Sequence, residues 1–387
     1  MPEIVDVAVV GGGVIGLSVA RELRRAGVEH VAVLEREPAV GQGSSSRANG
    51  GVRAQFSTRV NIELSAFSIG ELERLDRDTG LLGFRQTGYL LMTGTEAGER
   101  SLRTAFELQR SLGVAVEWLT PAEVCGRVPF VRPDGLRAGT FHGRDGFVDP
   151  YGVVTALRQD AERLGARILT GTEVVAIRRA PGAGFDVTTG EGTLRARWVV
   201  NAAGPSAGLL AALLEVDLPV TPVRRNLAYV RDRPGADPGG LIPMCVDLDT
   251  GVLMRREVSG GFVVAWSDPD DPPSWDTTVD PRFLEGLGAR VGHRFPLLED
   301  MPVDPRQCWA GLYPETPDHH AIIGDTPEVP GFVQCAGFGG HGVMHAPAAG
   351  LAVAELVALG RCASFDLHPL RPSRFAEGDL VVETAVL

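Results

Sequence analysis

The sequence predicts an α/β fold with a parallel sheet, joined to a second domain of the α+β class whose sheet is mainly antiparallel. In residues 5–34 an apolar strand, a glycine-rich turn, a helix and a second strand follow one another, an order that needs a parallel sheet covered on both faces. Between residues 216 and 306 helical periodicity largely disappears, and strands punctuated by Pro and Gly replace it. Glycine-rich turns and an apolar helix then return, so we expect the first domain to be discontinuous in sequence.

The first unit is predicted as a strand over residues 5–10, a helix over 14–26 and a strand over 30–34, with Gly27 ending the helix. Farther along, Thr120, Pro121 and Glu123 have the spacing of a capping box at a helix start. Asp149 before Pro150 starts another helix, which ends near Gly165.

The middle of the chain is predicted to form short strands over residues 173–178, 185–189 and 198–202, with a helix after Pro205. The last long helix is expected over Pro347–Leu359, with Gly360 as its cap. No apolar run looks long enough to span a bilayer.

Composition narrows the class of protein. The 387 residues exceed the usual size of one domain, and 44% hydrophobic with 22% charged residues is typical of a globular protein. The net charge of -12 argues against nucleic acid as a partner, because such binding needs clustered cations. The chain contains no lysine, which excludes chemistry based on a lysine amine.

The cysteines and the N-terminal residues indicate the cellular compartment in which the protein is expected. The five cysteines are odd in number and never form a Cys-x-x-Cys pair, so neither a disulfide framework nor a zinc site is indicated and a reducing compartment fits best. Glu3 and Asp6 stand where a secretory signal would carry basic residues. We therefore expect a cytoplasmic protein without a membrane partner.

A dinucleotide site is predicted at the first turn. Gly11, Gly13 and Gly16 form G-x-G-x-x-G between a strand and a helix, and Glu35 closes the next strand. Such a turn lets a pyrophosphate approach the backbone at the start of the helix, at Val14 and Ile15, while the acid accepts the adenosine ribose hydroxyls. Arg36 follows the acid, and the motif alone does not separate FAD from NAD.

A second glycine cluster, Gly337-Phe338-Gly339-Gly340-His341-Gly342, follows a predicted strand and precedes the final helix. It places backbone N–H donors at a helix start, which suits the negative charge of a reduced flavin. His341 and His345 are four residues apart, but no Glu follows the first and no third ligand is near, so no metal site is predicted.

The first loop and four further segments give the chain a clear resemblance to a known family. The segments are Gly43 to Phe56, Asn201 to Gly204, Trp309 to Asp318 and Ala336 to Met344, in addition to the first loop. In this order they resemble the D-amino-acid-oxidase-type (DAO) flavoproteins, which have an FAD-binding domain of the Rossmann-like, glutathione-reductase type. The nearest branch is sarcosine oxidase, the sarcosine oxidase β subunit and the L-proline dehydrogenase β subunit.

The resemblance implies domains, a cofactor and its contacts. The FAD-binding domain would comprise residues 1–82, 143–215 and 308–387, and the substrate domain residues 83–142 and 216–307. Residues along the pyrophosphate and the flavin would be Ser44, Ser45, Arg47, Ala48, Asn49, Gly50, Gly51, Ala203, Gly204, Gly311, Gly337, Gly339, Gly340, His341, Gly342, Val343 and Met344, with Val174 near the adenine.

For the substrate, the resemblance implies that Arg53 holds a carboxylate, a role that suits the bidentate guanidinium. His341 is a candidate flavin neighbour. Tyr229, Trp266 and Tyr313 could line the substrate side of the ring, although aromatic residues in strands often belong to a core instead.

Two departures from the family pattern matter. Covalent sarcosine oxidases attach flavin through a cysteine where this chain has Gly311, with Cys308 three residues earlier, so we expect non-covalent FAD. A second flavin on a histidine is not expected, because that place aligns loosely with Asp149. The two lysines of monomeric sarcosine oxidases are also missing, at Met344 and near Val263 or Val264, which weakens the case for a fast oxidase.

The sequence thus predicts an FAD-dependent enzyme that takes a hydride from the carbon next to the nitrogen of a small amine or amino acid, with O2 or another electron acceptor. Two alternatives stay open: a dehydrogenase of 2-hydroxy acids or polyol phosphates, and a non-catalytic flavoprotein scaffold. A homo-oligomer and a subunit of a larger complex are both compatible with the sequence.

Overall fold

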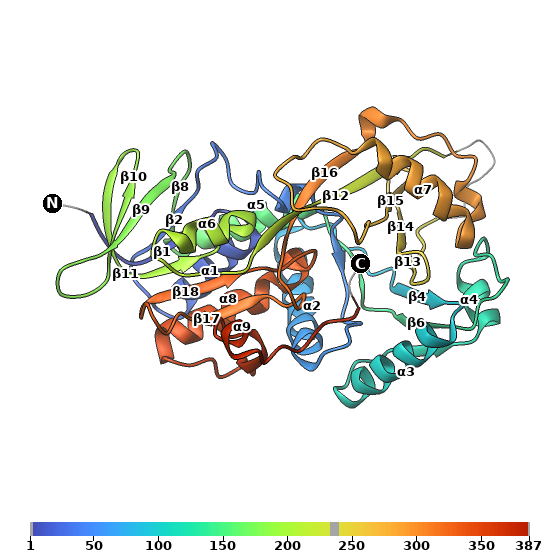
Figure 1. The fold of residues 1–387 in the computed structure, drawn as a ribbon, viewed down its shortest axis with the longest axis horizontal. Coiled ribbons are helices and arrows are strands. Elements are labelled where there is room, and N and C mark those ends of the chain that lie inside the picture. Colours follow the sequence, from blue (N-terminus) through green and yellow to red (C-terminus); the bar gives the residue numbers. More distant parts are fainter. Residues whose placement is uncertain (1–2, 233–239, 386–387) are drawn as a thin grey trace.

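The computed structural model describes residues 3–232 and 240–385, which form two domains, each built around one large sheet (Figure 1). The sheet of the first domain has the order β17-β18-β11-β1-β2-β8, with the hairpin β9-β10 attached to β11. Its strands are β1 (Glu3–Val10), β2 (Val31–Leu34), β8 (Arg167–Leu169), β9 (Val174–Arg179), β10 (Phe185–Thr189), β11 (Gly192–Asn201), β17 (Ile322–Asp325) and β18 (Phe332–Ala336). The neighbours of β1, β11 and β2 in the central path are parallel, as the βαβ pattern predicts.

Helices cover both faces of this sheet because its central strands are apolar and buried on both faces. They are α1 (Val14–Arg25), α2 (Arg59–Thr79), α5 (Pro150–Arg163), α6 (Ala207–Ala212), α8 (Gly342–Leu359) and the short α9 (Arg374–Glu377). Helix α8 packs between α1 and α2, so residues from the two ends of the chain share one core.

The second domain has the sheet β16-β12-β15-β14-β13-β4-β6-β5, in which every pair is antiparallel except β13 with β4. Its strands are β4 (Tyr89–Thr93), β5 (Glu117–Leu119), β6 (Ala138–His142), β12 (Thr221–Val230), β13 (Met244–Asp247), β14 (Val252–Arg256), β15 (Phe262–Ala265) and β16 (Trp309–Glu315). Its helices are α3 (Glu96–Ser111), α4 (Pro121–Arg127) and α7 (Pro281–Arg294).

Short elements complete the chain. A small ribbon joins β3 (Gly51–Val52) to β7 (Gly146–Phe147). The 3-10 turns are Ser45–Arg47, Gly204–Ser206, Pro296–Leu298, Pro305–Gln307 and His368–Leu370.

The structure confirms the two helix starts that the sequence predicts at Thr120 and Asp149. Thr120 and Glu123 form the complete capping box of α4, and Asp149 caps α5 through the N–H of Tyr151. The five cysteines are free thiols in the structure.

Three expectations need correction. Helix α7 lies inside the region read as strands, and it begins with the same Asp-Pro signal as α5, here Asp280 and Pro281. Helix α8 begins at Gly342 rather than at Pro347, which lies buried inside the helix. Strand β16 falls within the range assigned to the FAD-binding domain, yet it pairs with β12 in the second sheet.

The apolar stretch of α8 also proves longer than expected. Gly342–Leu359 is long and apolar enough to cross a membrane by length and composition, and 67% of this window is buried inside the protein. Its contacts with α1 and α2 explain the composition, because a helix that is apolar all round belongs in a core.

Candidate functional site

A cavity of about 750 Å³ lies between the two domains and is lined by residues of both. One end is formed by the turn after β1, the end of β2 and the loop before β9. The other end is formed by β12, β16 and the turn before α8. This size suits a large organic cofactor, because pockets for such ligands span roughly 300–1,000 Å³.

The turn after β1 is shaped by glycine. Gly11 has a φ of +113°, and a Cβ there would lie 2.3 Å from the carbonyl oxygen of Ala202. A Cβ at Gly16 would lie 1.9 Å from the carbonyl oxygen of Gly11, so helix and turn are in direct contact. Gly11 and Gly13 line the cavity, whereas Gly16 packs behind the turn. These are the positions that the G-x-G-x-x-G motif requires, because its third glycine serves close packing of the helix.

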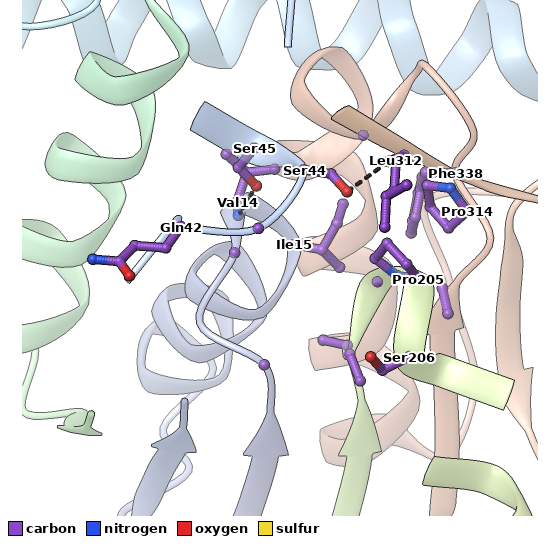
Figure 2. A pocket seen from close by; sticks show the side chains of 18 of the residues that line it. Val14, Ile15, Gln42, Ser44, Ser45, Pro205, Ser206, Leu312, Pro314 and Phe338 are labelled. Atoms are coloured by element: carbon purple, nitrogen blue, oxygen red, sulfur yellow. Dashed lines mark hydrogen bonds between the residues drawn. The ribbon is translucent and has the colours of Figure 1, made fainter. Parts of the chain in front are cut away.

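Helix α1 presents its N-terminus to the cavity without a side-chain cap from Gly13 and without an acid in its first turn. The N–H of Val14 donates to Ser45 Oγ at 3.1 Å, which fixes the loop 43–47 beside the helix start. Figure 2 shows Val14, Ser44 and Ser45 together, with Ser44 Oγ donating to the carbonyl of Leu312 at 2.6 Å. Orphan N–H donors and small hydroxyls make this place suitable for a pyrophosphate.

Glu35 marks the adenosine end of the cavity. Its Oε2 accepts from the N–H of Gly12 at 2.7 Å and its Oε1 from the N–H of Glu37 at 2.9 Å. Each oxygen keeps a lone pair for a ribose hydroxyl. Arg36 and Val174 line the same end, as predicted.

The opposite end is built where β16 meets the turn before α8. A Cβ at Gly311 would lie 3.1 Å from Arg47 Cβ, and a Cβ at Gly340 would lie 2.6 Å from the Tyr313 ring. Arg47 Nη1 donates to Ala310 O at 2.8 Å, and Trp309 Nε1 donates to Arg47 O at 3.0 Å. These contacts hold β16, Arg47 and the turn before α8 close together at this end of the cavity, which we call the ring end because the flavin ring would lie there.

Most predicted cofactor residues line the cavity. They are Gly11, Gly13, Val14, Ile15, Glu35, Arg36, Ser44, Ser45, Arg47, Ala48, Asn49, Val174, Ala203, Gly204, Gly311, Gly337, Gly339, Gly340, Gly342 and Val343, together with Tyr313. Besides Gly16, four predicted cofactor residues do not line it: Gly50, Gly51, His341 and Met344.

Those four support the cavity from behind. A Cβ at Gly50 would lie 2.2 Å from Val148 O, and one at Gly51 would lie 2.4 Å from Tyr89 Oη. Met344 belongs to the core of the first domain. The His341 ring is buried and stands edge-on to Phe56, with 4.9 Å between ring centroids.

Electrostatics limits what His341 can do. Burial and the neighbouring Arg53 cation lower the pKa of His341 well below its ordinary value. The same causes lower the pKa of His345 to about 3, and its Nε2 is hydrogen-bonded to Ser65 Oγ at 2.8 Å. Both rings are therefore neutral, weakly basic groups at neutral pH.

Arg53 does not line the cavity in this structure. It is 1% exposed, its guanidinium lies 4.0 Å from the centroid of Phe56, and it donates to the carbonyl oxygens of Gln55 and Ala385. It lies one layer behind the ring end, since Phe56 touches His341 and the charge of Arg53 acts on Tyr313.

Two predicted substrate residues are placed elsewhere. Trp266 belongs to the core of the second domain, where Arg290 stacks on its ring at 3.9 Å. Tyr229 Oη donates to Gly260 O at 2.9 Å, away from the cavity. Tyr313 alone of the three aromatic candidates lines the cavity, and burial raises the pKa of its phenol.

Sequence reasoning missed Arg225 on β12. It lines the cavity opposite Gly311 in the strand register, and it lies 5.8 Å from the Tyr313 centroid. No motif marks it, because only the pairing of β12 with β16 brings it to the ring end. Trp275 and Thr277, from the loop before α7, also line the cavity.

We next consider the residues that could attach a flavin covalently. Cys308 does not line the cavity and packs against the second core. Cys335 is the one cysteine among the described lining residues, which include no histidine, and burial raises the pKa of its thiol. Asp149, where the related enzymes' second flavin would attach, serves as the cap of α5.

The fold and this cavity define a dinucleotide-dependent oxidoreductase with a separate substrate domain. The glycine turns, the uncapped start of α1, the acid Glu35 and the residues at the opposite end of the cavity fit FAD, whose ribose would lie at Glu35. Residues 6–356 match the family described as DAO, FAD dependent oxidoreductase, and the chain belongs to this family. FAD is its cofactor.

Individual relatives agree with this assignment. The chain is 30% identical over 434 residues to FAD-dependent oxidoreductase domain-containing protein 1 of Bos taurus, covering 100% of this chain and 88% of that protein. It is 30% identical to glycine oxidase of Geobacillus kaustophilus, covering 95% and 97%. The crystal structure of L-proline dehydrogenase from P. horikoshii superposes with a TM-score of 0.91 at 29% identity, covering 98% and 100%.

Proposed function

We propose that the protein oxidises a small amino acid or N-alkyl amino acid at the carbon next to nitrogen. The observation that carries the proposal is Arg53, a fully buried guanidinium one layer behind the ring end whose described hydrogen bonds both end on neutral carbonyls. The nearby carboxylates of Glu383 and Asp145 act on the Arg53 charge through space, without a described hydrogen bond to it, so this position favours a ligand that brings a carboxylate into direct contact.

The bases available support an amine over an alcohol. An alcohol must lose its proton to a base before hydride transfer, whereas a neutral amine supplies its own lone pair. Among the residues expected beside the flavin, His341 carries an imidazole, and its lowered pKa makes it a weak base. The relatives named for glycine and proline oxidation fit the same substrate class.

FAD, when bound, supplies the two-electron oxidant that accepts the hydride from the substrate carbon; the amine becomes an imine, and water hydrolyses the imine to a carbonyl compound and an amine. The chain's own contribution is positional. Arg53 would hold the carboxylate and Tyr313 would form one wall, while the closely packed turn 337–342 excludes water from the ring end.

The test is anaerobic bleaching of the flavin absorbance. Sarcosine, proline and glycine are titrated beside dimethylamine, which keeps the N-methyl group of sarcosine but lacks the carboxylate, and beside lactate. We expect bleaching by at least one amino acid and at least about 100-fold weaker bleaching by dimethylamine, because the charged hydrogen bonds to Arg53 are lost. Bleaching by lactate alone would select the hydroxy-acid alternative, and bleaching by none of them would select the scaffold.

A further inference from the structure

Arg53 is closed off by a segment that lies far away in the sequence. Residues 380–385 run from α9 back to the junction of the two domains, as the dark red chain in Figure 1 shows. Ala385 O accepts from Arg53 Nη2, although 332 residues separate the two. We call residues 380–385 the closing segment.

The closing segment is held mainly by one carboxylate. Glu383 is 0% exposed and accepts from the N–H of Ser57 at 2.9 Å, the N–H of Thr58 at 3.2 Å, Thr58 Oγ1 at 2.6 Å and Asn61 Nδ2 at 3.0 Å, in addition to Ser57 Oγ. These donors stand at the start of α2, where the helix favours a negative charge. Burial raises the pKa of Glu383, but the hydrogen bonds from Ser57 and Thr58 outweigh it and the pKa is lowered, so the carboxylate is charged at neutral pH.

The remainder of the segment is weakly attached. Leu380, Val381 and Val382 are 41%, 46% and 52% exposed, and residues 380–385 belong to neither helix nor strand. Segments with few buried apolar contacts open at low free-energy cost. Opening would therefore depend chiefly on the release of Glu383.

The hydrogen bond from Arg53 to the Ala385 carbonyl is weaker than a hydrogen bond to a carboxylate would be. A neutral carbonyl accepts a single bond from the guanidinium, whereas a carboxylate can accept two charge-assisted bonds and also compensates the buried charge. The nearby acid Asp145 is already engaged by Ala54 N at 2.9 Å, Gln55 Nε2 at 3.1 Å and His142 Nδ1 at 2.6 Å. A small carboxylate would thus displace the Ala385 carbonyl from Arg53.

We propose that the closing segment is a latch over the carboxylate end of the substrate site, fastened by Glu383, and that it must open before a carboxylate ligand reaches Arg53. The inference rests on the proposed role of Arg53 in binding the substrate carboxylate. It adds that the closed state competes with substrate, so the apparent affinity for substrate is reduced by the fraction of molecules that are open.

The variant Glu383→Gln weakens the latch with little change in shape, because an amide loses the charge and cannot accept from all six donors, the five at the start of α2 and the N–H of Ala385. Its matched control is Glu377→Gln, six residues earlier, where the exposed carboxylate pairs with Arg371 outside the latch. Acetate is the ligand probe, and its binding to the FAD-loaded enzyme is followed by the perturbation of the flavin spectrum. We expect acetate to bind about ten-fold more tightly to Glu383→Gln than to the native enzyme and to Glu377→Gln.

Hydrogen exchange tests the latch without any substitution. In the native holoenzyme the amide of Ala385 donates to Glu383 Oε1 and that of Thr384 to Ser57 Oγ. Saturating acetate should accelerate exchange in the peptide containing residues 380–385, while the peptides of α9 stay unchanged. Tighter acetate binding by Glu383→Gln together with accelerated exchange supports the latch.

Other outcomes overturn the latch. Equal acetate affinity in the three proteins, acetate that binds none of them, or exchange that stays constant or slows with acetate bound would each contradict the latch. The latch and the proposed function can fail separately. Amino acids that bleach the flavin equally in the native and Glu383→Gln enzymes contradict the latch alone. Acetate effects without bleaching by any amine contradict only the proposed reaction.

Discussion

Gly16 sets the tightest steric limit among single residues at the site, although it does not line the cavity. Because a Cβ there would lie 1.9 Å from the Gly11 carbonyl oxygen, Gly16→Ala must move the turn that holds the pyrophosphate. We expect a loss of about 1–3 kcal/mol in stability from overpacking and at least about ten-fold weaker FAD binding. Urea unfolding and fluorescence titration of the apoprotein with FAD measure the two effects.

Gly70, in the middle of α2, provides the matched control. Nothing lies within 4 Å of a Cβ at this position, so Gly70→Ala should stabilise the protein by about 0.5–1 kcal/mol and leave FAD affinity unchanged. Equal behaviour of the two alanine variants would contradict the steric role assigned to Gly16.

Gly311 leads to a prediction about how the flavin is held. This glycine takes the place of the family's covalent cysteine, and Cys308 lies outside the cavity. We therefore expect trichloroacetic acid to precipitate colourless protein and to leave all FAD in the supernatant. Yellow protein in the pellet would contradict non-covalent binding, and Cys335→Ser would then show whether the cysteine among the lining residues is the anchor.

Single residues also show how far sequence reasoning reaches. The steric roles of Gly11 and Gly16 and the cap at Asp149 are confirmed, because each depends on neighbours within one supersecondary unit. Trp266, Tyr229 and His341 do not line the cavity, and the sequence could not decide this, because the direction of a side chain depends on which face of a sheet or turn is covered. The contact of Arg53 with Ala385 joins opposite ends of the chain, and no local pattern announces it.

At the scale of elements, a buried ion network connects α1, α2 and α5. Arg21 on α1 is 3% exposed, and it pairs with Asp160 on α5 at 2.6 Å and Glu22 at 2.8 Å, with Glu71 on α2 at 3.8 Å. Arg21→Ala leaves the three acids with the more exposed Arg25 as their shared cation, so we expect a loss of about 3 kcal/mol in unfolding free energy, at the lower end for a broken buried pair. Denaturant unfolding measures this loss.

Arg74 offers a control on the same network. Its side chain is half exposed and touches Glu71 from the solvent side, so Arg74→Ala should cost less than about 1 kcal/mol. If Arg21→Ala costs no more than Arg74→Ala, the three helices are held by apolar packing alone.

The sequence predicts a helix or strand correctly where a capping or turn residue stands next to a stretch with the matching hydrophobic periodicity. Strands β1 and β2 and helices α1, α4 and α5 fall within a few residues of their expected bounds. Helix α7 was missed although Asp280 and Pro281 give a clear start, because the strand-rich surroundings dominated the interpretation. Helix α8 begins before its proline because burial against α1 and α2 outweighs the helix-breaking tendency of Pro347.

For the whole molecule, three buried histidines make stability depend on pH. Burial lowers the pKa of His320, His341 and His345, and both ring nitrogens of His320 lack a partner among the described residues. Below about pH 6.5 the unfolded chain binds protons at these histidines while the folded chain does not. The contribution of these neutral histidines to the unfolding free energy is therefore fully present above that pH. The unfolding free energy falls as the pH decreases below it, by up to about 1.4 kcal/mol per pH unit for each histidine.

One substitution isolates this effect from the general titration of carboxylates. The pKa of His345 is about 3 in the folded state, so His345→Asn should remove one proton from the difference between the unfolded and folded states throughout the range from about pH 6 to about pH 4. The slope of unfolding free energy against pH, measured by urea unfolding of the FAD-loaded enzyme, should become shallower by up to about 1.4 kcal/mol per unit. His368→Asn, at an exposed histidine, controls for removal of an imidazole. An unchanged slope in His345→Asn would mean that His345 takes up its proton in the folded protein, and then α8 would carry a positive charge beside Arg53 at the place where the substrate carboxylate is expected.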